Sequence, residues 1–109
     1  MTEKLLGKIT SAEFGTIRDY PFMIGLQFYF KMSSSGVGDG GRYTVNISDA
    51  CKWNSSDEKL NAYERVLKSV NGLLEDAKVN YVSELIGKPV EVTLEHNTFK
   101  DFRILTEVL

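Results

Sequence analysis

Strict alternation of apolar and polar side chains over residues 22–31 is the feature that most constrains this fold. The apolar phase consists of Phe22, Ile24, Leu26, Phe28 and Phe30. A period of two residues over this length is typical of a β-strand. One buried face and one solvated face are characteristic of antiparallel sheets. The segment therefore predicts an antiparallel strand whose even-numbered residues are buried.

The same periodicity predicts four further strands. In the first, the apolar phase slips between Ile9 and Ala12, and a β-bulge would account for such a slip. In the third, Tyr43, Val45 and Ile47 share one face. The predicted strands cover residues 5–17, 22–31, 43–48, 90–95 and 99–108.

A long helix is predicted from Ser56 to Ala77, between the third and fourth strands. Ser55 and Glu58 have the spacing of a capping box, which marks a helix start. Apolar residues, Leu67 among them, then recur every three or four positions, so this face should pack on the sheet. A short helix is expected over residues 81–86.

The order β-β-β-α-β-β suits a five-stranded barrel of the OB type, whose helix lies between strands three and four. We predict a mainly β, α+β fold: a five-stranded antiparallel OB-like barrel or curled sheet with one long helix packed on it. An open sheet with the helix on one face is the alternative. A chain of 109 residues should form a single domain over residues 1–109. In either arrangement the core should include Leu26, Phe28, Val45, Leu67 and Val92.

The composition limits the environment and the partners. The net charge is −2, so nucleic-acid binding would need a local basic patch. Cys51 is the only cysteine, which excludes an internal disulfide and favours a reducing, cytoplasmic location. The first eight residues contain too few apolar side chains for a secretory signal, and no apolar run is long enough for a membrane span.

Residues suited to catalysis are few. His96 and Cys51 are the only residues of their types, so they assemble neither a nucleophile–base pair nor a metal cluster. We therefore expect no enzyme, no catalytic residue, no metal site and no cofactor. The glycine-rich segment Ser33–Gly41 joins two antiparallel strands, so it lacks the helix dipole of a phosphate-binding loop. With only Val37 to bury, it is expected to be a mobile hairpin tip.

The outer face of the second and third strands is the most promising site. An aromatic side chain with flanking cations is how OB-type modules stack bases and follow phosphates. The alternative is an ordinary polar face that includes one tyrosine, with acidic neighbours such as Glu91 and Glu95 diluting its field. The candidate ligand-binding residues are Tyr29, Lys31, Arg42, Thr44, Asn46, Lys100 and Arg103.

From Gly36 onward the chain resembles small uncharacterised proteins encoded by bacteriophages and prophages. The matching segments are the Gly-x-Gly-x-Gly-Gly-x-Tyr run ending at Tyr43, Leu73-Leu74, Val79–Leu85, Gly87–Val92 and Arg103-Ile104-Leu105. The resemblance implies a phage origin and a non-enzymatic role, and it assigns no site residues. In element order alone, the chain also resembles OB-fold single-stranded-DNA-binding proteins.

These observations predict a phage-type accessory binding protein whose partner is single-stranded nucleic acid. The alternative is a structural or assembly protein that interacts with itself, or with a phage or host protein, through the glycine-rich segment or an edge strand. No membrane partner is expected.

Overall fold

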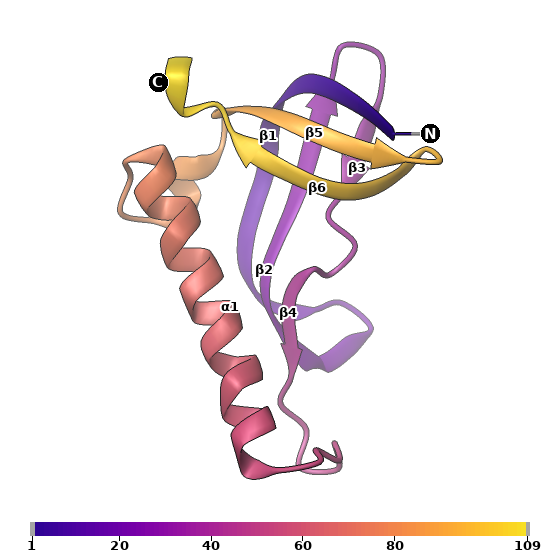
Figure 1. Cartoon of the computed structure of the whole chain (residues 1–109), viewed down its shortest axis with the longest axis vertical. Coiled ribbons are helices and arrows are strands. Elements are labelled where there is room, and N and C mark those ends of the chain that lie inside the picture. The colour runs from indigo at the N-terminus through magenta and orange to yellow at the C-terminus, as the bar shows by residue number, and fades with distance from the viewer. Residues whose placement is uncertain (1, 109) are drawn as a thin grey trace.

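The computed structural model describes residues 2–108, which form a curled antiparallel sheet with a long helix, α1 (Ser56–Ala77), along one side (Figure 1). Two 3₁₀ segments, η1 (Val82–Leu85) and η2 (Thr106–Val108), complete the helices. The mainly β, α+β class and the placement of the long helix are confirmed. None of the described helices is long and apolar enough to cross a membrane. The strands are β1 (Thr2–Ile17), β2 (Tyr20–Met32), β3 (Gly36–Gly38), β4 (Tyr43–Asn46), β5 (Pro89–Glu95) and β6 (Thr98–Ile104).

The sheet is built around the long strand β1, and its order is β3-β2-β1-β5-β6, with β4 also paired to β2. Over Thr2–Lys8 β1 pairs with β5, and over Gly7–Ile17 it pairs with β2. Within residues 2–108 no ladder joins β6 to β3 or β4, so the sheet is curled and not closed into a barrel. Since β3 and β4 are only three and four residues long, they leave no continuous edge for β6 to join.

The predicted irregularity in the first strand is a change of register between Ile9 and Ser11. Ile9 pairs with Phe30, while Ala12 pairs with Phe28, and all four side chains are buried. The bulge keeps the apolar residues of β1 on the inner face on both sides of the slip. The prediction from the sequence phase is therefore confirmed.

An aromatic cluster forms the centre of the core. The rings of Phe30 and Phe102 lie 4.7 Å apart, and that of Phe28 lies 5.2 Å from Phe102. Phe99 stacks on Phe30 with ring centroids 5.6 Å apart. Distances and angles of this kind are those that aromatic pairs prefer. Four of the five predicted core residues are buried, namely Leu26, Phe28, Val45 and Val92.

Leu67, the fifth, is 64% exposed, so its predicted burial is wrong. The helix contacts the sheet through β4 and β6, and its fully buried residues are Val66 and Ala77. Leu60 lies two turns before Leu67 and is exposed as well. Figure 1 shows the first turns of α1, where Leu60 lies, extending past the end of β4. Leu67 directly follows the buried Val66, so it lies about 100° around the helix from the residue that contacts the sheet and points away from it.

The buried phase of β2 does not continue to its start. Phe22 is exposed and Ile24 is only half-buried, whereas both were expected in the core. This part of β2 belongs to the far end of the β1–β2 hairpin, where Phe14 of β1 is exposed too. Period-two alternation reports which face a residue is on, and burial needs a second layer above that face.

The glycine-rich segment is not an unpaired loop tip. Gly36–Gly38 forms β3 and pairs with residues 29–31 of β2. Val37 packs against the core, and Asp39 is 6% exposed. The segment was expected to be a mobile hairpin tip with only Val37 to bury. Its main-chain pairing with β2 is a contact that its composition does not indicate.

Three predicted elements differ in their bounds or type. The last strand was expected to reach residue 108 but ends at Ile104, because its partner β5 begins at Pro89. The third strand ends at Asn46 instead of residue 48, since the Asn46 side chain accepts the backbone N–H of Ser48 at 2.8 Å. The short helix expected over residues 81–86 is the 3₁₀ segment η1.

Candidate functional site

Three lysines gather on the outer face of the sheet. Lys8 of β1 is directly opposite Lys31 of β2 in the ladder, so both side chains leave the same face. Lys4 is four residues before Lys8 on the same strand, which also places it on this face. All three are exposed, and among residues 2–108 none of them takes part in an ion pair. We call Lys4, Lys8 and Lys31 the lysine patch.

The pair Lys8–Lys31 has an energetic consequence. Like charges directly opposite each other in an antiparallel pair destabilise the sheet. Neither ammonium group forms an ion pair with a carboxylate among the described residues. Glu91, opposite Leu6 on the same face, is the nearest acidic residue along the β1–β5 ladder, and it is paired with Arg103. An anion bound between Lys8 and Lys31 would remove their repulsion.

Tyr29 lies beside the lysine patch. It precedes Lys31 by two residues, so its side chain shares the outer face, and it is 48% exposed. The ring extends over β3, where a Cβ on Gly36 would lie 2.7 Å from Tyr29 Oη and one on Gly38 3.9 Å from Cδ1. A side chain at position 36 would therefore displace the ring, which gives a physical reason for glycine there.

Arg42, another candidate, is engaged within the chain. It lies between β4 and β6, where its Nη1 donates to the backbone oxygen of Lys100 at 2.6 Å. Its Nη2 lies 3.5 Å from a carboxylate oxygen of Asp101, and its guanidinium lies 5.9 Å from the Tyr43 ring centroid. Burial raises the pKa of Tyr43 to about 12, so the phenol is neutral in this contact. The arginine bridges the open side of the curled sheet.

The candidate cations on β6 are neutralised too. The Nζ of Lys100 lies 2.9 Å from a carboxylate oxygen of Glu95. Arg103 donates to Glu91 and to Glu107 at 3.2 Å, and these carboxylates raise the pKa of Arg103 above its usual range. Their charge is thus less available to an anionic ligand than that of the lysine patch.

The two polar candidates on β4 satisfy their own backbone. Thr44 is 6% exposed, although its phase predicted an outer position open to solvent. Its hydroxyl donates to the carbonyl of Gly41 at 2.6 Å, under the covering glycine segment. Asn46 is half-buried and caps the turn after β4. Of the seven candidates, the structure groups Tyr29 and Lys31 with two lysines that the prediction omitted.

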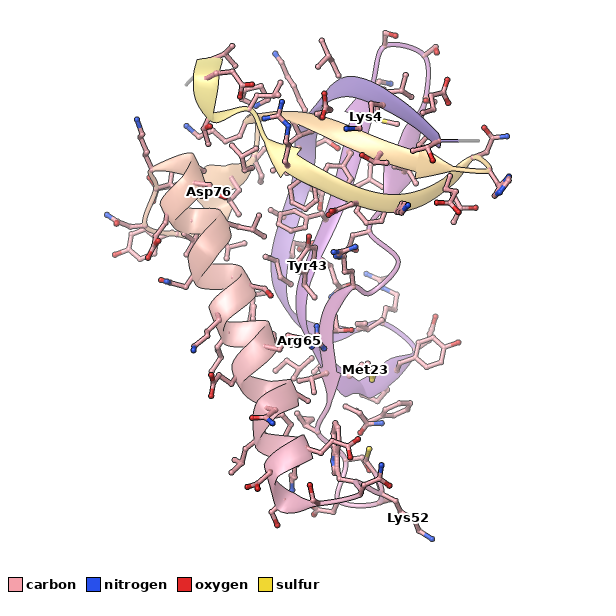
Figure 2. The ribbon with its side chains drawn as sticks, viewed as in Figure 1. Lys4, Met23, Tyr43, Lys52, Arg65 and Asp76 are labelled. Atoms are coloured by element: carbon pink, nitrogen blue, oxygen red, sulfur yellow. The ribbon has the colours of Figure 1, made fainter. Side chains whose placement is uncertain are left out.

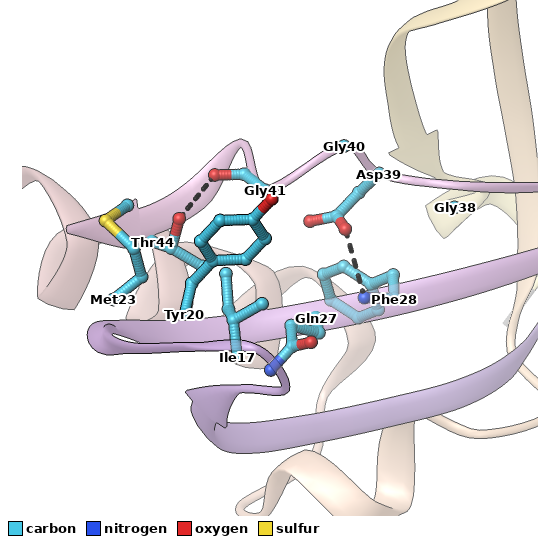
Figure 3. Close-up of a pocket in the computed structure, with 10 residues that line it drawn as sticks. All are labelled: Ile17, Tyr20, Met23, Gln27, Phe28, Gly38, Asp39, Gly40, Gly41 and Thr44. Carbon is cyan, nitrogen blue, oxygen red and sulfur yellow. Dashed lines mark hydrogen bonds between the residues drawn. The ribbon is translucent and has the colours of Figure 1, made fainter. Parts of the chain in front are cut away.

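A cavity of about 460 Å³ continues the outer face beyond Tyr29 (Figure 3). Its floor is the outer phase of β2, including Met23 and Gln27. Residues 38–41 line one side, and Ile17 and Tyr20 from the β1–β2 turn line the other. This volume falls in the usual range for small-molecule pockets, about 300–1,000 Å³.

Asp39 contributes a buried carboxylate to this cavity. The backbone N–H of Phe28 donates to its Oδ1 at 3.4 Å. Its Oδ2 is buried and accepts no hydrogen bond of ordinary geometry among the residues that the structure describes. Burial raises the pKa of this carboxyl above its ordinary value, an effect that the backbone N–H groups of Phe28 and Gly41 oppose.

The residues expected to lack catalytic partners lie in ordinary structural positions. His96 and Asn97 have φ values of 53° and 64° and form the exposed two-residue turn between β5 and β6. Cys51 is a half-buried free thiol. Within residues 2–108 no group of three or more His, Cys, Asp or Glu side chains is placed to hold a metal ion.

Sequence reasoning missed Lys8 and Asp39 for different reasons. Lys8 belongs to the site only because it lies opposite Lys31 in the ladder. The bulge after Ile9 shifts the register of the two strands, so this pairing cannot be counted from the sequence. Asp39 is in a polar, glycine-rich segment, which is typical of solvent-exposed loops. Its burial follows from β3 pairing with β2, and local composition carries no signal of that pairing.

No family model matches the chain, and neither a curated protein nor a solved structure is similar to it in the comparisons. The resemblance to phage-encoded proteins and the OB-type likeness therefore stay predictions.

Proposed function

We propose that this chain is a non-enzymatic accessory protein that binds single-stranded nucleic acid on the outer face of β1 and β2. The observation that carries the proposal is the Lys8–Lys31 pair, which forms no ion pair among the described residues, beside the half-exposed ring of Tyr29. A phosphate between the two ammonium groups offsets their repulsion. A base stacked on the tyrosine adds affinity without regard to sequence.

The arrangement suits one strand of nucleic acid. Residues two apart on a β-strand lie about 7 Å from each other and point the same way. Tyr29 and Lys31 therefore reach a base and a neighbouring phosphate together, and Lys8 contributes from the adjacent strand. The overall charge of −2 opposes a polyanion, so we expect micromolar affinity at best near physiological salt.

Five of the seven candidate residues are left out of the proposed interface. Arg42, Lys100 and Arg103 form ion pairs with carboxylates of the same chain, so they are not included in the proposed interface. Thr44 and Asn46 bond the backbone. The proposed interface consists of Tyr29 and the lysine patch, and an accessory role of this kind agrees with a phage origin.

Replacing Lys8 and Lys31 with alanine should weaken binding of a dT-rich oligonucleotide and flatten its salt dependence. Each phosphate that no longer meets a lysine should reduce the slope of log K against log salt by about 0.7. Tyr29→Ala should remove about 1–3 kcal/mol, the worth of one base–aromatic stack. Fluorescence anisotropy over a salt series measures both effects.

Lys100→Ala is the matched control, since that lysine is also exposed but is paired with Glu95. It should leave the salt slope near that of the parent protein. If the parent fails to bind at tens of micromolar protein in low salt, the nucleic-acid proposal is wrong.

Self-assembly is the second candidate, and a free strand edge favours it. From Thr10 to Ile17, the edge of β1 opposite β2 has no strand partner among the described residues. Phe14 on this stretch is exposed. The β6 edge is less open, because Arg42 binds the carbonyl of Lys100 and the Asp101 side chain accepts the N–H of Phe102. Strand addition is a known mode of pairing at such free edges.

Sedimentation of the protein at increasing concentration tests this candidate. We expect a dimer at high concentration that Phe14→Asp abolishes, because a charge on an exposed edge disfavours strand pairing. A monomer at all accessible concentrations would leave the assembly role without support.

A further inference from the structure

The cavity follows Tyr29 along the outer face of β2. Gln27, on its floor, precedes Tyr29 by two residues on β2. Gly38 lines the cavity and is also the ladder partner of Tyr29. The lysine patch, the tyrosine and the cavity therefore follow one another along the outer face of β2.

The cavity holds an acceptor without a well-formed hydrogen bond among the described residues. Asp39 is 6% exposed, and its Oδ2 is unpaired within the described part of the chain. Figure 3 shows this oxygen turned away from Phe28, toward the side of the cavity where Tyr20 and Gly41 lie. A buried carboxylate oxygen without a hydrogen bond is costly, so a ligand that donates there is favoured.

The walls suit a flat, partly apolar ligand. Ile17, Met23 and the ring of Tyr20 supply apolar and aromatic surface around the carboxylate. Tyr20 is more than half exposed, which leaves its ring accessible to a partner. A nucleobase has a π-face for such a ring and N–H groups on its edge for an acceptor.

We infer that this cavity is a nucleobase pocket in which Asp39 selects bases that carry an exocyclic amino group. The inference rests on the proposed function, because it concerns the same face and the same ligand. Cytosine and adenine donate from N4 and N6, whereas thymine presents the O4 carbonyl at the equivalent position. Two acceptors, Asp39 Oδ2 and thymine O4, would face each other without a proton between them.

The comparison of dC10 with dT10 tests the selection, since the two strands carry the same charge and both have one-ring bases. The full chain is titrated against each oligonucleotide by fluorescence anisotropy, in low salt at pH 8. We expect about tenfold tighter binding of dC10, in line with a hydrogen bond to a charged acceptor.

Asp39→Asn is the decisive variant. It keeps the shape and an oxygen for the N–H of Phe28, and it turns an amide donor toward the cavity. Thymine O4 accepts from that donor, so the preference for dC10 should be lost or reversed. Lys31→Ala is the matched control and should weaken both strands by the same factor.

The outcomes separate the two proposals. Equal affinity of the parent protein for dC10 and dT10, with the effect of Lys31→Ala intact, overturns the pocket and leaves nucleic-acid binding in place. Binding of neither strand overturns both. A preference for dC10 that survives Asp39→Asn shows that another group reads the base, which also overturns the role of Asp39. The ratio of the parent protein's affinities for dC10 and dT10 tests base selection even if the Asp39→Asn variant does not fold.

Discussion

Phe30→Ala should destabilise the fold by about 3–5 kcal/mol, the range for deleting a buried aromatic ring. The Phe30 side chain is completely buried and packs against three other phenylalanine rings. The loss combines the transfer free energy of the ring with the cost of the cavity that it leaves. Equilibrium unfolding in urea, followed by the change in midpoint, measures it.

Tyr29→Ala is the adjacent control, since Tyr29 points to the outer face and is half exposed. We expect it to cost less than about 1.5 kcal/mol, because only part of the ring leaves apolar surroundings. Equal losses for the two variants would contradict the assignment of the inner and outer faces of β2.

Gly25→Ala should be severely destabilising for a reason that involves the backbone. A Cβ at this position would clash with the carbonyl oxygen of Tyr43 and lie 2.7 Å from Thr44 Cα. Gly25 also has a φ of 153°, a conformation that other residues rarely adopt. Overpacking costs about 1–3 kcal/mol and strained backbone a further 1–3 kcal/mol, so roughly 2–6 kcal/mol in total is expected.

Gly15 is the ladder partner of Gly25 and provides a matched comparison. A Cβ there would meet nothing within 4 Å among residues 2–108, and its φ is not positive. Gly15→Ala should therefore leave the folding stability unchanged or raise it by up to about 1 kcal/mol, because alanine lowers the conformational entropy of the unfolded chain. The melting temperatures of the two variants are compared. A Gly25→Ala protein as stable as the Gly15→Ala protein would contradict the close approach of the paired strands β2 and β4.

Local sequence patterns predicted the elements well. Alternation located β2 and β5, the phase slip after Ile9 located a bulge, and Ser55 with Glu58 located the start of α1. These features depend on neighbours within a few residues, so they are written into the sequence itself. Their order was enough for the fold class.

The candidate site could be predicted only in part. Tyr29 and Lys31 follow from the outer phase of β2, which alternation alone determines. Arg42 had the right residue type for an anion, but the partner that occupies it, Asp101, is 59 positions later and comes near only in the folded chain. Charges at this separation in sequence carry no local signal of their pairing.

What the sequence by itself determined is the approximate position of β1, β2, β4, β5, β6 and α1, and the alternating faces of the strands. Only the tertiary structure decided which faces are covered. It left Leu67 exposed, buried Asp39, and placed Lys8 opposite Lys31. Figure 2 shows Lys4 of the lysine patch, and Arg65 extending from α1 toward β4. The physical reason is that burial and charge pairing depend on register and on the second layer. Both arise from contacts between segments far apart in the chain.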